Sequence, residues 1–190
     1  IISSNCKNYR LVEGKILLDE DRHYATSVKY FQFDENLFLS AHGDWVDPTP
    51  VVTPSIHIFA GNMFTHADWV SNVGINPYMF FHGEEQVLTM SSFAAGYRIF
   101  HGKQIPSYHY RFAENHTSKQ TYEQIVSNDI INARKSRSNA EFKRFIRNLD
   151  DKVLEEYRQY SGVDYINRKL ENRAITRTVQ PSIENDWEIP

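Results

Sequence analysis

The first 110 residues contain short apolar runs separated by charged or turn-forming residues, which is a pattern typical of strands. Two such runs are Ile16–Leu18 and Tyr30–Phe33. Residues 55–65 alternate apolar and polar positions and reach Gly61, which predicts a strand that ends in a turn. Residues 42–55 are rich in proline, and because proline cannot donate to a strand ladder, we expect a loop there.

Helical spacing of apolar residues occurs twice in the same region. Residues 66–74 suit a short helix that is closed by a glycine. Apolar positions recur at helical intervals over residues 84–95, and Gly96 follows as a suitable C-terminal cap. Short strands over 97–100 and 106–111 come next.

The remaining residues are polar and predict helices over 118–136 and 138–162. Ser138 is expected to cap the second helix, because Glu141 follows three residues later as in a capping box. Residues 174–190 show no period, and we expect an extended tail. The apolar positions of the second helix lie on one face and predict packing against the rest of the protein: Phe142, Phe145, Ile146, Leu149, Val153, Leu154 and Tyr157.

Composition narrows the class of protein. A chain of 190 residues with 41% hydrophobic and 14% aromatic residues is long enough for one domain with its own core. The net charge of −3 gives no electrostatic footprint for nucleic acid, so we expect no nucleic-acid partner. No apolar run is long enough to span a membrane. The single cysteine, Cys6, excludes an internal disulfide and favours a reducing, cytoplasmic location.

The most informative short stretch is MFFHGEE, residues 79–85, in which two adjacent carboxylates open the predicted helix. Glu84 and Glu85 have a simple structural explanation, because acidic residues in a first helical turn contribute about 0.3–1 kcal/mol. They also have a functional explanation. Carboxylates accept hydrogen bonds from sugar hydroxyls, and the aromatic residues just upstream present apolar faces for sugar rings. Downstream, His109 lies between tyrosines and is a potential metal ligand.

The stretch from IFAGNMFT through NPYMFFHGEEQVLTMSSFAAGYRIFHGKQIPSYHYR resembles the glycosyltransferases typified by the cytoplasmic hydroxyproline-polypeptide GlcNAc-transferases. The resemblance covers about residues 1–170. Asn76 stands where the family often has Asp, and Arg98 replaces an acidic residue, which leaves the sugar specificity open. The matching positions are Ala60, Gly61, Phe64, Pro77, Phe81, Gly83, Glu84, Glu85, Gly96, Tyr97, His109, Tyr110 and Arg111.

The resemblance implies an α/β fold in which residues 1–110 form the acceptor-side part of an A-type, Rossmann-like glycosyltransferase domain. Residues 111–173 are then a helical extension, followed by the tail over 174–190. The family's early metal motif, Asp-Ser-His or Asp-x-Asp, belongs before the segment ISSNCKNY. We therefore expect that the chain lacks the N-terminal nucleotide-binding half.

The implied activity is transfer of a GlcNAc-like sugar from a UDP-sugar to a hydroxyl on a protein or glycan, with Mn²⁺ or Mg²⁺ and with retention of configuration. Glu84 and Glu85 would act as the catalytic pair that holds hydroxyls, and His109 would bind the metal. Asp19 and Asp21 follow a short apolar strand and either bind the same cation or form a solvated turn. The expected substrate-binding positions are Gly61, Asn62, Phe81, His82, Gly83 and Tyr97.

Two other hypotheses remain open at this point. The chain could be a carbohydrate- or protein-binding module derived from a glycosyltransferase, without catalysis. It could also be an assembly domain in which residues 118–162 dock a partner. The histidines other than His82 and His109 have no metal-binding spacing, and we expect them to be structural or exposed; those considered are His42, His57, His66 and His101.

Overall fold

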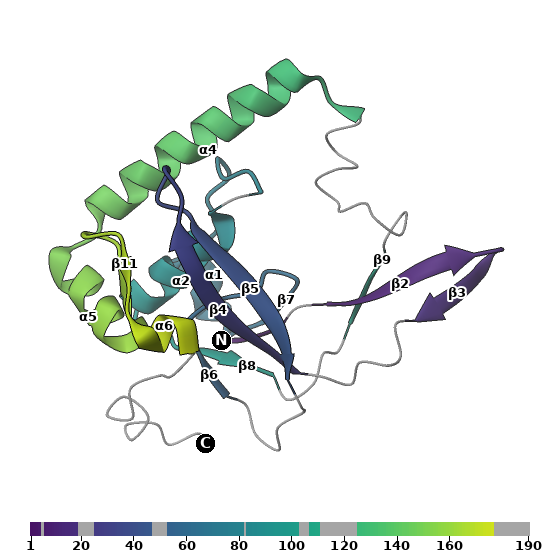
Figure 1. Ribbon diagram of the computed structural model, residues 1–190, viewed down its shortest axis with the longest axis horizontal. Helices are drawn as coiled ribbons and strands as arrows, with labels where there is room; N and C mark the ends of the chain where they lie inside the picture. Colours follow the sequence, from purple (N-terminus) through teal and green to yellow (C-terminus); the bar gives the residue numbers. More distant parts are fainter. Residues whose placement is uncertain are drawn as a thin grey trace.

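The computed structural model describes residues 1–4, 6–18, 25–46, 53–81, 83–102, 107–110 and 125–176. It is a mixed α/β structure in which helices pack beside short strands (Figure 1). A four-stranded sheet has the order β6-β8-β1-β7, and β1 runs parallel to β8 and antiparallel to β7. Its strands are β1 (Ile2–Ser4), β6 (Thr53–Ser55), β7 (Asn62–Phe64) and β8 (Ile99–His101).

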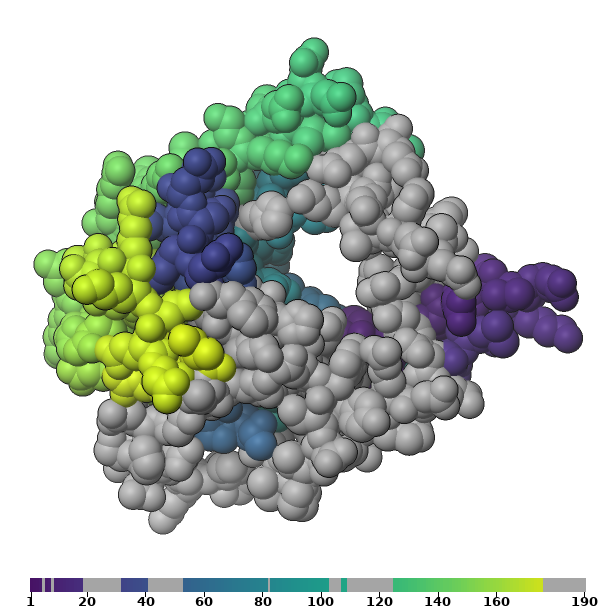
Figure 2. Space-filling view, viewed as in Figure 1, coloured from purple at the N-terminus to yellow at the C-terminus, as the bar shows by residue number. Residues whose placement is uncertain are grey.

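A second sheet repeats the parallel arrangement with the order β3-β2-β9. Its strands are β2 (Lys7–Val12), β3 (Lys15–Leu18) and β9 (Tyr108–Tyr110), and β2 is parallel to β9. Since β2 follows β1 and β9 follows β8 along the chain, the same two parts of the sequence pair twice. The β2–β3 hairpin projects from the body of the molecule (Figures 1 and 2). Its apolar side chains are exposed: Leu11, Val12, Ile16, Leu17 and Leu18.

A long antiparallel hairpin consists of β4 (Ala25–Phe33) and β5 (Leu39–Val46). The expected loop over 42–55 is therefore wrong at both ends, because β5 covers residues 42–46 and β6 covers 53–55. Residues 39–46 contain no proline, so the β5 backbone can pair with β4. Pro54 is tolerated because β6 is an outer strand of its sheet among the described residues, where a missing N–H costs no ladder bond.

Five helices accompany these strands in the described part of the chain: α1 (Ala67–Asn72), α2 (Glu84–Ala94), α4 (Asn128–Asn148), α5 (Asp151–Ser161) and α6 (Asn172–Thr176). A small hairpin of β10 (Val163–Asp164) and β11 (Lys169–Leu170) lies between α5 and α6. The predicted helices over 66–74 and 84–95 are confirmed. No helix of the described residues is long and apolar enough to cross a membrane. Because α6 ends at Thr176, the chain is still helical over the first three residues of the expected tail; the rest of the tail lies outside the described residues.

The predicted helix boundary at Ser138 is wrong, because α4 continues through this position without a break. The Ser138 hydroxyl does not cap a helix; it accepts a hydrogen bond from the backbone N–H of Phe80 at 3.0 Å. The chain breaks instead at Asp150, whose carboxylate accepts from the N–H of Lys152 at 2.7 Å and caps α5. Ser138 can therefore lie inside a helix, because its hydroxyl bonds to a residue outside the helix.

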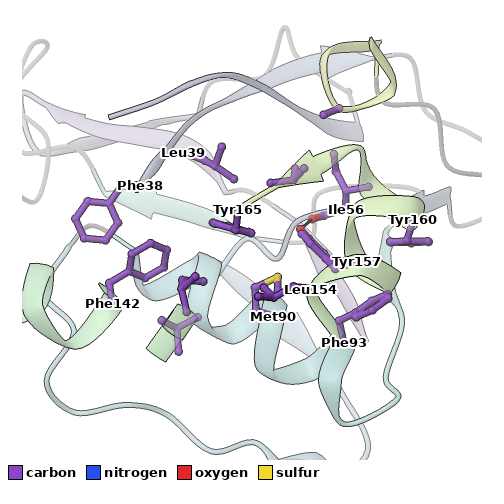
Figure 3. Packing of buried hydrophobic residues seen from close by; sticks show 14 residues of the cluster. Phe38, Leu39, Ile56, Met90, Phe93, Phe142, Leu154, Tyr157, Tyr160 and Tyr165 are labelled. Atoms are coloured by element: carbon purple, nitrogen blue, oxygen red, sulfur yellow. Dashed lines mark hydrogen bonds between the residues drawn. The ribbon is translucent and has the colours of Figure 1, made fainter. Parts of the chain in front are cut away.

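One hydrophobic cluster joins the two halves of the sequence (Figure 3). Phe142 of α4 and Tyr157 of α5 are completely buried against residues of β5, α2 and the segment after β6. The predicted apolar face of residues 138–162 is therefore confirmed. The members include Phe38, Leu39, Ile56, Val87, Met90, Phe93, Phe142, Ile146, Leu154, Tyr157, Tyr160 and Tyr165.

Residues 56–60, which we name the anchored segment, lie against this core and are not the strand that the alternation predicts. Side chains from other elements take the place of ladder partners. The N–H groups of Ile58 and Phe59 donate to the hydroxyls of Thr89 (2.9 Å) and Ser3 (3.3 Å). The Tyr157 hydroxyl donates to the carbonyl of Ile56 at 2.8 Å. Buried backbone groups need partners, and here specific hydroxyls supply them.

Candidate active site

The two adjacent glutamates lie at the start of α2, as predicted. Gly83 precedes them with a φ of +79°, a left-handed conformation that glycine adopts without steric cost. A Cβ at this position would lie 2.2 Å from the Cε1 atom of Phe38, so the position has no room for a side chain. The tight turn at Gly83 brings the first turn of α2 against the β4–β5 hairpin.

Glu85 is held by the anchored segment. Its Oε1 accepts a hydrogen bond from the backbone N–H of Ala60 at 2.8 Å, and its Oε2 lies 3.3 Å from the Nε2 atom of His57. Burial opposes ionisation, but the hydrogen bond and charge of His57, together with the Ala60 N–H, outweigh it and lower the pKa of Glu85. The side chain still has 41% of its surface exposed. The result is an anchored carboxylate that remains accessible.

Glu84 differs from its neighbour, because no described residue donates a hydrogen bond to its carboxylate. Partial burial, and then the nearby charge of Glu85, raise the pKa of Glu84. The pair therefore consists of one carboxylate that is stabilised as an anion and one whose anion is disfavoured. Pairs of carboxylates with separated pKa values are typical of sites that bind and move protons.

His57 is the partner that the sequence did not single out for the site. Its side chain is only 2% exposed, and its backbone N–H donates to the Ser55 hydroxyl at 3.1 Å. The same hydroxyl lies 2.8 Å from the Nε2 atom of buried His101. The Phe59 ring stacks on His101 and meets His57 edge-on. The expectation that these two histidines are structural fits this packing, but His57 also orients Glu85. The sequence offered one signal for His57, because it occupies a polar position in a run that alternates apolar and polar residues.

A cavity of about 390 Å³ opens beside Glu85, between the β4–β5 hairpin and the start of α2. Its lining includes two aromatic residues, buried Phe38 and exposed Phe81, together with the polar side chains of His57 and Glu85. Its size is that of a small-molecule site, and its lining is mainly polar, as suits a ligand rich in hydroxyl groups. The remaining lining residues are Asp34, Leu39, Ser40, Gly83 and Gln86.

Gln86 fixes one wall of this cavity. Its side chain accepts from the N–H of Leu39 at 3.1 Å and donates to the carbonyl of the same residue at 3.0 Å. The helix and the hairpin are thereby joined by two buried hydrogen bonds next to Glu85. Of the expected substrate-binding residues, Phe81 and Gly83 line the cavity. His82 lies outside the described residues.

Gly61 and Asn62 directly follow Ala60, so the structure brings them near the Glu85 anchor without placing them in the cavity wall. A Cβ at Gly61 would lie 3.0 Å from the sulfur of Cys6, which explains the small residue in this turn. The Asn62 side chain accepts from the Ser107 hydroxyl at 2.6 Å and donates to the Cys6 sulfur at 3.4 Å. These contacts join the turn to Cys6, which lies between β1 and β2, and to Ser107, which precedes β9.

Tyr97 lies beyond the opposite end of α2 from the glutamates. A helix of 11 residues separates them by roughly 16 Å along its axis. The Tyr97 hydroxyl accepts a hydrogen bond from Asn72 at 3.0 Å, and its ring packs on a second small core around Trp69 and Ile99. The structure therefore does not bring Tyr97 to the cavity; it braces α1 against α2.

The predicted metal ligands are only partly covered by the structure. Asp19 and Asp21 lie outside the described residues, and His109 is described only through its backbone in β9. Within the described part of the chain, no group of three histidine, cysteine or acidic side chains could hold a metal ion. The described residues thus do not form a metal site by themselves.

Comparison with known proteins identifies the family. The family model described as Glycosyltransferase (GlcNAc) matches residues 2–161. The chain belongs to this glycosyltransferase family. The match runs from β1 to the end of α5, so it includes the cavity, both glutamates and the helices that complete the core. Searches of curated proteins and of solved structures found no match.

Proposed function

We propose that this glycosyltransferase moves a GlcNAc-like sugar from a UDP-sugar to a hydroxyl on a protein or glycan, and that the cavity beside Glu85 holds the sugar. The observation that carries the proposal is the anchored, accessible carboxylate of Glu85 in a cavity that is also lined by Phe81, an aromatic side chain that is 43% exposed. Aromatic faces pack against the apolar faces of sugar rings, while carboxylates accept hydrogen bonds from sugar hydroxyls.

Glu85 has the capacity for such a ligand. An ionised carboxylate offers about four lone-pair sites. Two partners from the anchored segment, Ala60 and His57, occupy one site on each oxygen, and the exposed part of the side chain can accept from sugar hydroxyls. Since these two contacts fix the carboxylate before the sugar arrives, little reorganisation is needed on binding.

Glu84 is assigned to the acceptor side of the reaction. Its raised pKa makes it a better proton acceptor than an ordinary glutamate near neutral pH, which suits a residue that orients an incoming hydroxyl. In this proposal neither glutamate forms a bond to the sugar. They position the reactants and stabilise charge, and the family resemblance suggests retention of configuration at the sugar carbon.

The proposal includes Mn²⁺ or Mg²⁺ with the UDP-sugar, and His109 with Asp19 and Asp21 as the ligands to test. Carboxylate oxygens suit both ions, and an imidazole nitrogen suits a transition metal such as Mn²⁺. When bound, the ion would neutralise the charge of the leaving diphosphate.

The first experiment is calorimetric titration of the full chain with UDP, with and without Mn²⁺. Metal-dependent binding that His109→Ala abolishes supports the donor part of the proposal. Binding of the same strength with and without metal, or in the His109→Ala variant, contradicts the metal assignment.

The second experiment measures sugar transfer from UDP-GlcNAc to acceptor. The Glu85→Gln variant should lose activity by at least about a hundredfold, a size typical for the removal of a preorganised charged group. Glu156→Gln, which changes an exposed carboxylate on α5, is the matched control and should stay active. Equal activity of the two variants would refute the role of Glu85.

One observation favours a second candidate function, a sugar-binding module without catalysis. Both oxygens of Glu85 already hold partners within the protein, as expected if its main task is to anchor residues 56–60. In that case wild-type chain binds GlcNAc-containing ligands and transfers nothing, and Glu85→Gln only weakens binding. Turnover by the wild-type chain decides between the two functions.

A further inference from the structure

A second cavity, of about 320 Å³, lies between α4 and the loop that leads to the glutamates. Its walls combine three side chains that suit contact with a polypeptide, Pro77, Tyr78 and Phe80, with two arginines of α4. Arginine and tyrosine are enriched at positions that dominate binding to protein partners. The described lining residues are Pro77, Tyr78, Met79, Phe80, Arg134 and Arg137, and none of these is acidic.

Arg137 is preorganised for an anionic partner. The centre of its guanidinium group lies 3.6 Å from the centroid of the Tyr78 ring, so the ring occupies one face of the group. Stacking leaves the in-plane N–H groups directed outward, and these form the fork that binds carboxylates through two hydrogen bonds. Arg137 makes no ion pair with a described carboxylate. Arg134 adds a second positive charge, 5.9 Å from the centroid of the Phe80 ring.

The charge of the second cavity's described lining differs in sign from that of the whole chain. The chain has a net charge of −3, whereas the described lining has two arginines and no acidic residue. Helix α4 runs along the rim of the molecule, where its outer surface is open to solvent (Figure 2). A local positive surface of this kind attracts acidic ligands and rejects basic ones.

The two cavities share a wall. Phe80 lines the second cavity and Phe81 lines the first, and their rings meet edge-to-face with centroids 4.8 Å apart. The wall is also fixed to α4, because the Phe80 N–H donates to the Ser138 hydroxyl at 3.0 Å. The adjacent residues Phe80 and Phe81 therefore lie between a ligand in the second cavity and the cavity beside Glu85.

We propose that the second cavity is a subsite for the acceptor, and that it binds a carboxylate side chain of an acidic protein segment whose neighbouring hydroxyl receives the sugar. This inference rests on the proposed function for the position of the hydroxyl, but the binding of an acidic peptide does not depend on catalysis. Charge complementarity with Arg137 selects the peptide, and the Tyr78 ring and Pro77 provide contact area for its backbone.

The test uses the full chain and two short synthetic peptides that differ only in charge. One has a central threonine flanked by glutamates, and the other has glutamines in their place. Binding is measured by fluorescence anisotropy for wild type, Arg137→Gln and Arg147→Gln. Arg147 is the matched control, because it lies on the same helix and carries the same charge but does not line the cavity.

The expected result is that the glutamate peptide binds wild type about tenfold more tightly than the glutamine peptide, as for the gain of a charge-assisted hydrogen-bonded pair. Arg137→Gln should remove this preference, and Arg147→Gln should keep it. Equal binding of the two peptides, or equal loss in both variants, overturns the proposal.

A titration with UDP separates this inference from the proposed function. If Arg137→Gln weakens UDP binding and leaves peptide binding unchanged, the cavity serves the donor diphosphate and the acceptor assignment is wrong. If wild type binds the glutamate peptide selectively but neither binds UDP nor transfers sugar, the proposed transfer fails while the acidic-peptide site stands.

Discussion

Glu84 and Glu85 are adjacent in sequence, yet their surroundings shift the two pKa values in opposite directions. Glu85 gains an N–H donor and a histidine from the anchored segment, whereas Glu84 gains burial and a neighbouring negative charge. A favourable position at a helix start cannot explain this difference, because both residues lie in the first turn of α2. The difference arises from tertiary contacts and therefore was not available from the sequence.

These shifts predict opposite effects of two similar substitutions on stability. The lowered pKa of Glu85 means that its contribution to the free energy of unfolding is present above the ordinary pKa of 4.5 and is lost as the pH falls through the folded-state value. The raised pKa of Glu84 means that its charged form costs stability above the same value. At pH 7, Glu85→Gln should lower stability by about 1–2 kcal/mol, the size of a lost charge-assisted hydrogen bond. Glu84→Gln should raise the melting temperature.

Thermal melts followed by circular dichroism at pH 7 and well below pH 4.5 check this prediction. In acid, wild type and both variants should converge, because protonated glutamate and glutamine carry the same charge. Shifts of the same sign for the two variants at pH 7 would contradict the assigned surroundings.

The positive φ and the close packing of Gly83 predict a loss of stability on substitution. Gly83→Ala should destabilise the protein by about 2–4 kcal/mol, since it combines an unfavourable positive φ with a collision against Phe38. Gly96→Ala is the matched control, because Gly96 has a similar φ of +83° but nothing within 4 Å of the added Cβ, and it should cost only about 1 kcal/mol. Urea denaturation measures both, and equal losses would show that crowding at Gly83 is unimportant.

At the scale of elements, the spacing of apolar residues predicted the helices and strands that depend on local sequence. The bounds of α2 followed from apolar spacing and from Gly96, and the strands β3, β4, β8 and β9 followed from short apolar runs. The misplaced boundary at Ser138 and the missing strand over the anchored segment share one cause. Ser138 uses its own hydroxyl to bond to the backbone N–H of distant Phe80, and in the anchored segment the hydroxyl of distant Thr89 bonds to the backbone N–H of Ile58; no local pattern records such partners.

Thr89 tests the role of these hydroxyls. It accepts from the N–H of Ile58 and donates to the carbonyl of Glu85 at 2.6 Å. Thr89→Val keeps the shape but leaves the buried Ile58 N–H unpaired, which should cost about 1–3 kcal/mol. Thr89→Ser keeps the hydroxyl and should cost less than Thr89→Val. Chemical denaturation compares the two; a larger loss for serine would mean that the methyl group, and not the hydrogen bond, holds this segment.

At the scale of the molecule, the helices after residue 125 complete the core that supports the candidate site. Phe142 packs on Phe38 with ring centroids 4.6 Å apart, and Phe38 in turn lines the cavity beside Glu85. The sequence indicated that α4 and α5 have an apolar face, but not which residues that face covers. The covered residues belong to β5, α2 and the anchored segment, so the helices are a structural part of the candidate site.

This shared core predicts a large effect of a distant substitution. Phe142→Ala should destabilise the protein by about 3–5 kcal/mol, as for other large core residues, and should weaken sugar binding at the same time. Phe64→Ala, at a side chain that is 82% exposed, is the control. Far-UV and near-UV circular dichroism should report the same melting midpoint if the halves unfold together. Two separate transitions would show that α4 and α5 fold independently.

The two parallel ladders have a consequence for how the protein is made. Ile2 pairs with Phe100 and Lys7 pairs with Tyr108, so strands made early wait for partners made much later. At about 5–20 residues per second, ribosomal synthesis delays these pairings by several seconds, while the β2–β3 hairpin can form at once from local contacts. During that interval the nascent chain presents the apolar hairpin without its β9 neighbour. Because the apolar side chains of the hairpin stay exposed after β9 has paired, the hairpin is expected to favour aggregation both during synthesis and afterwards.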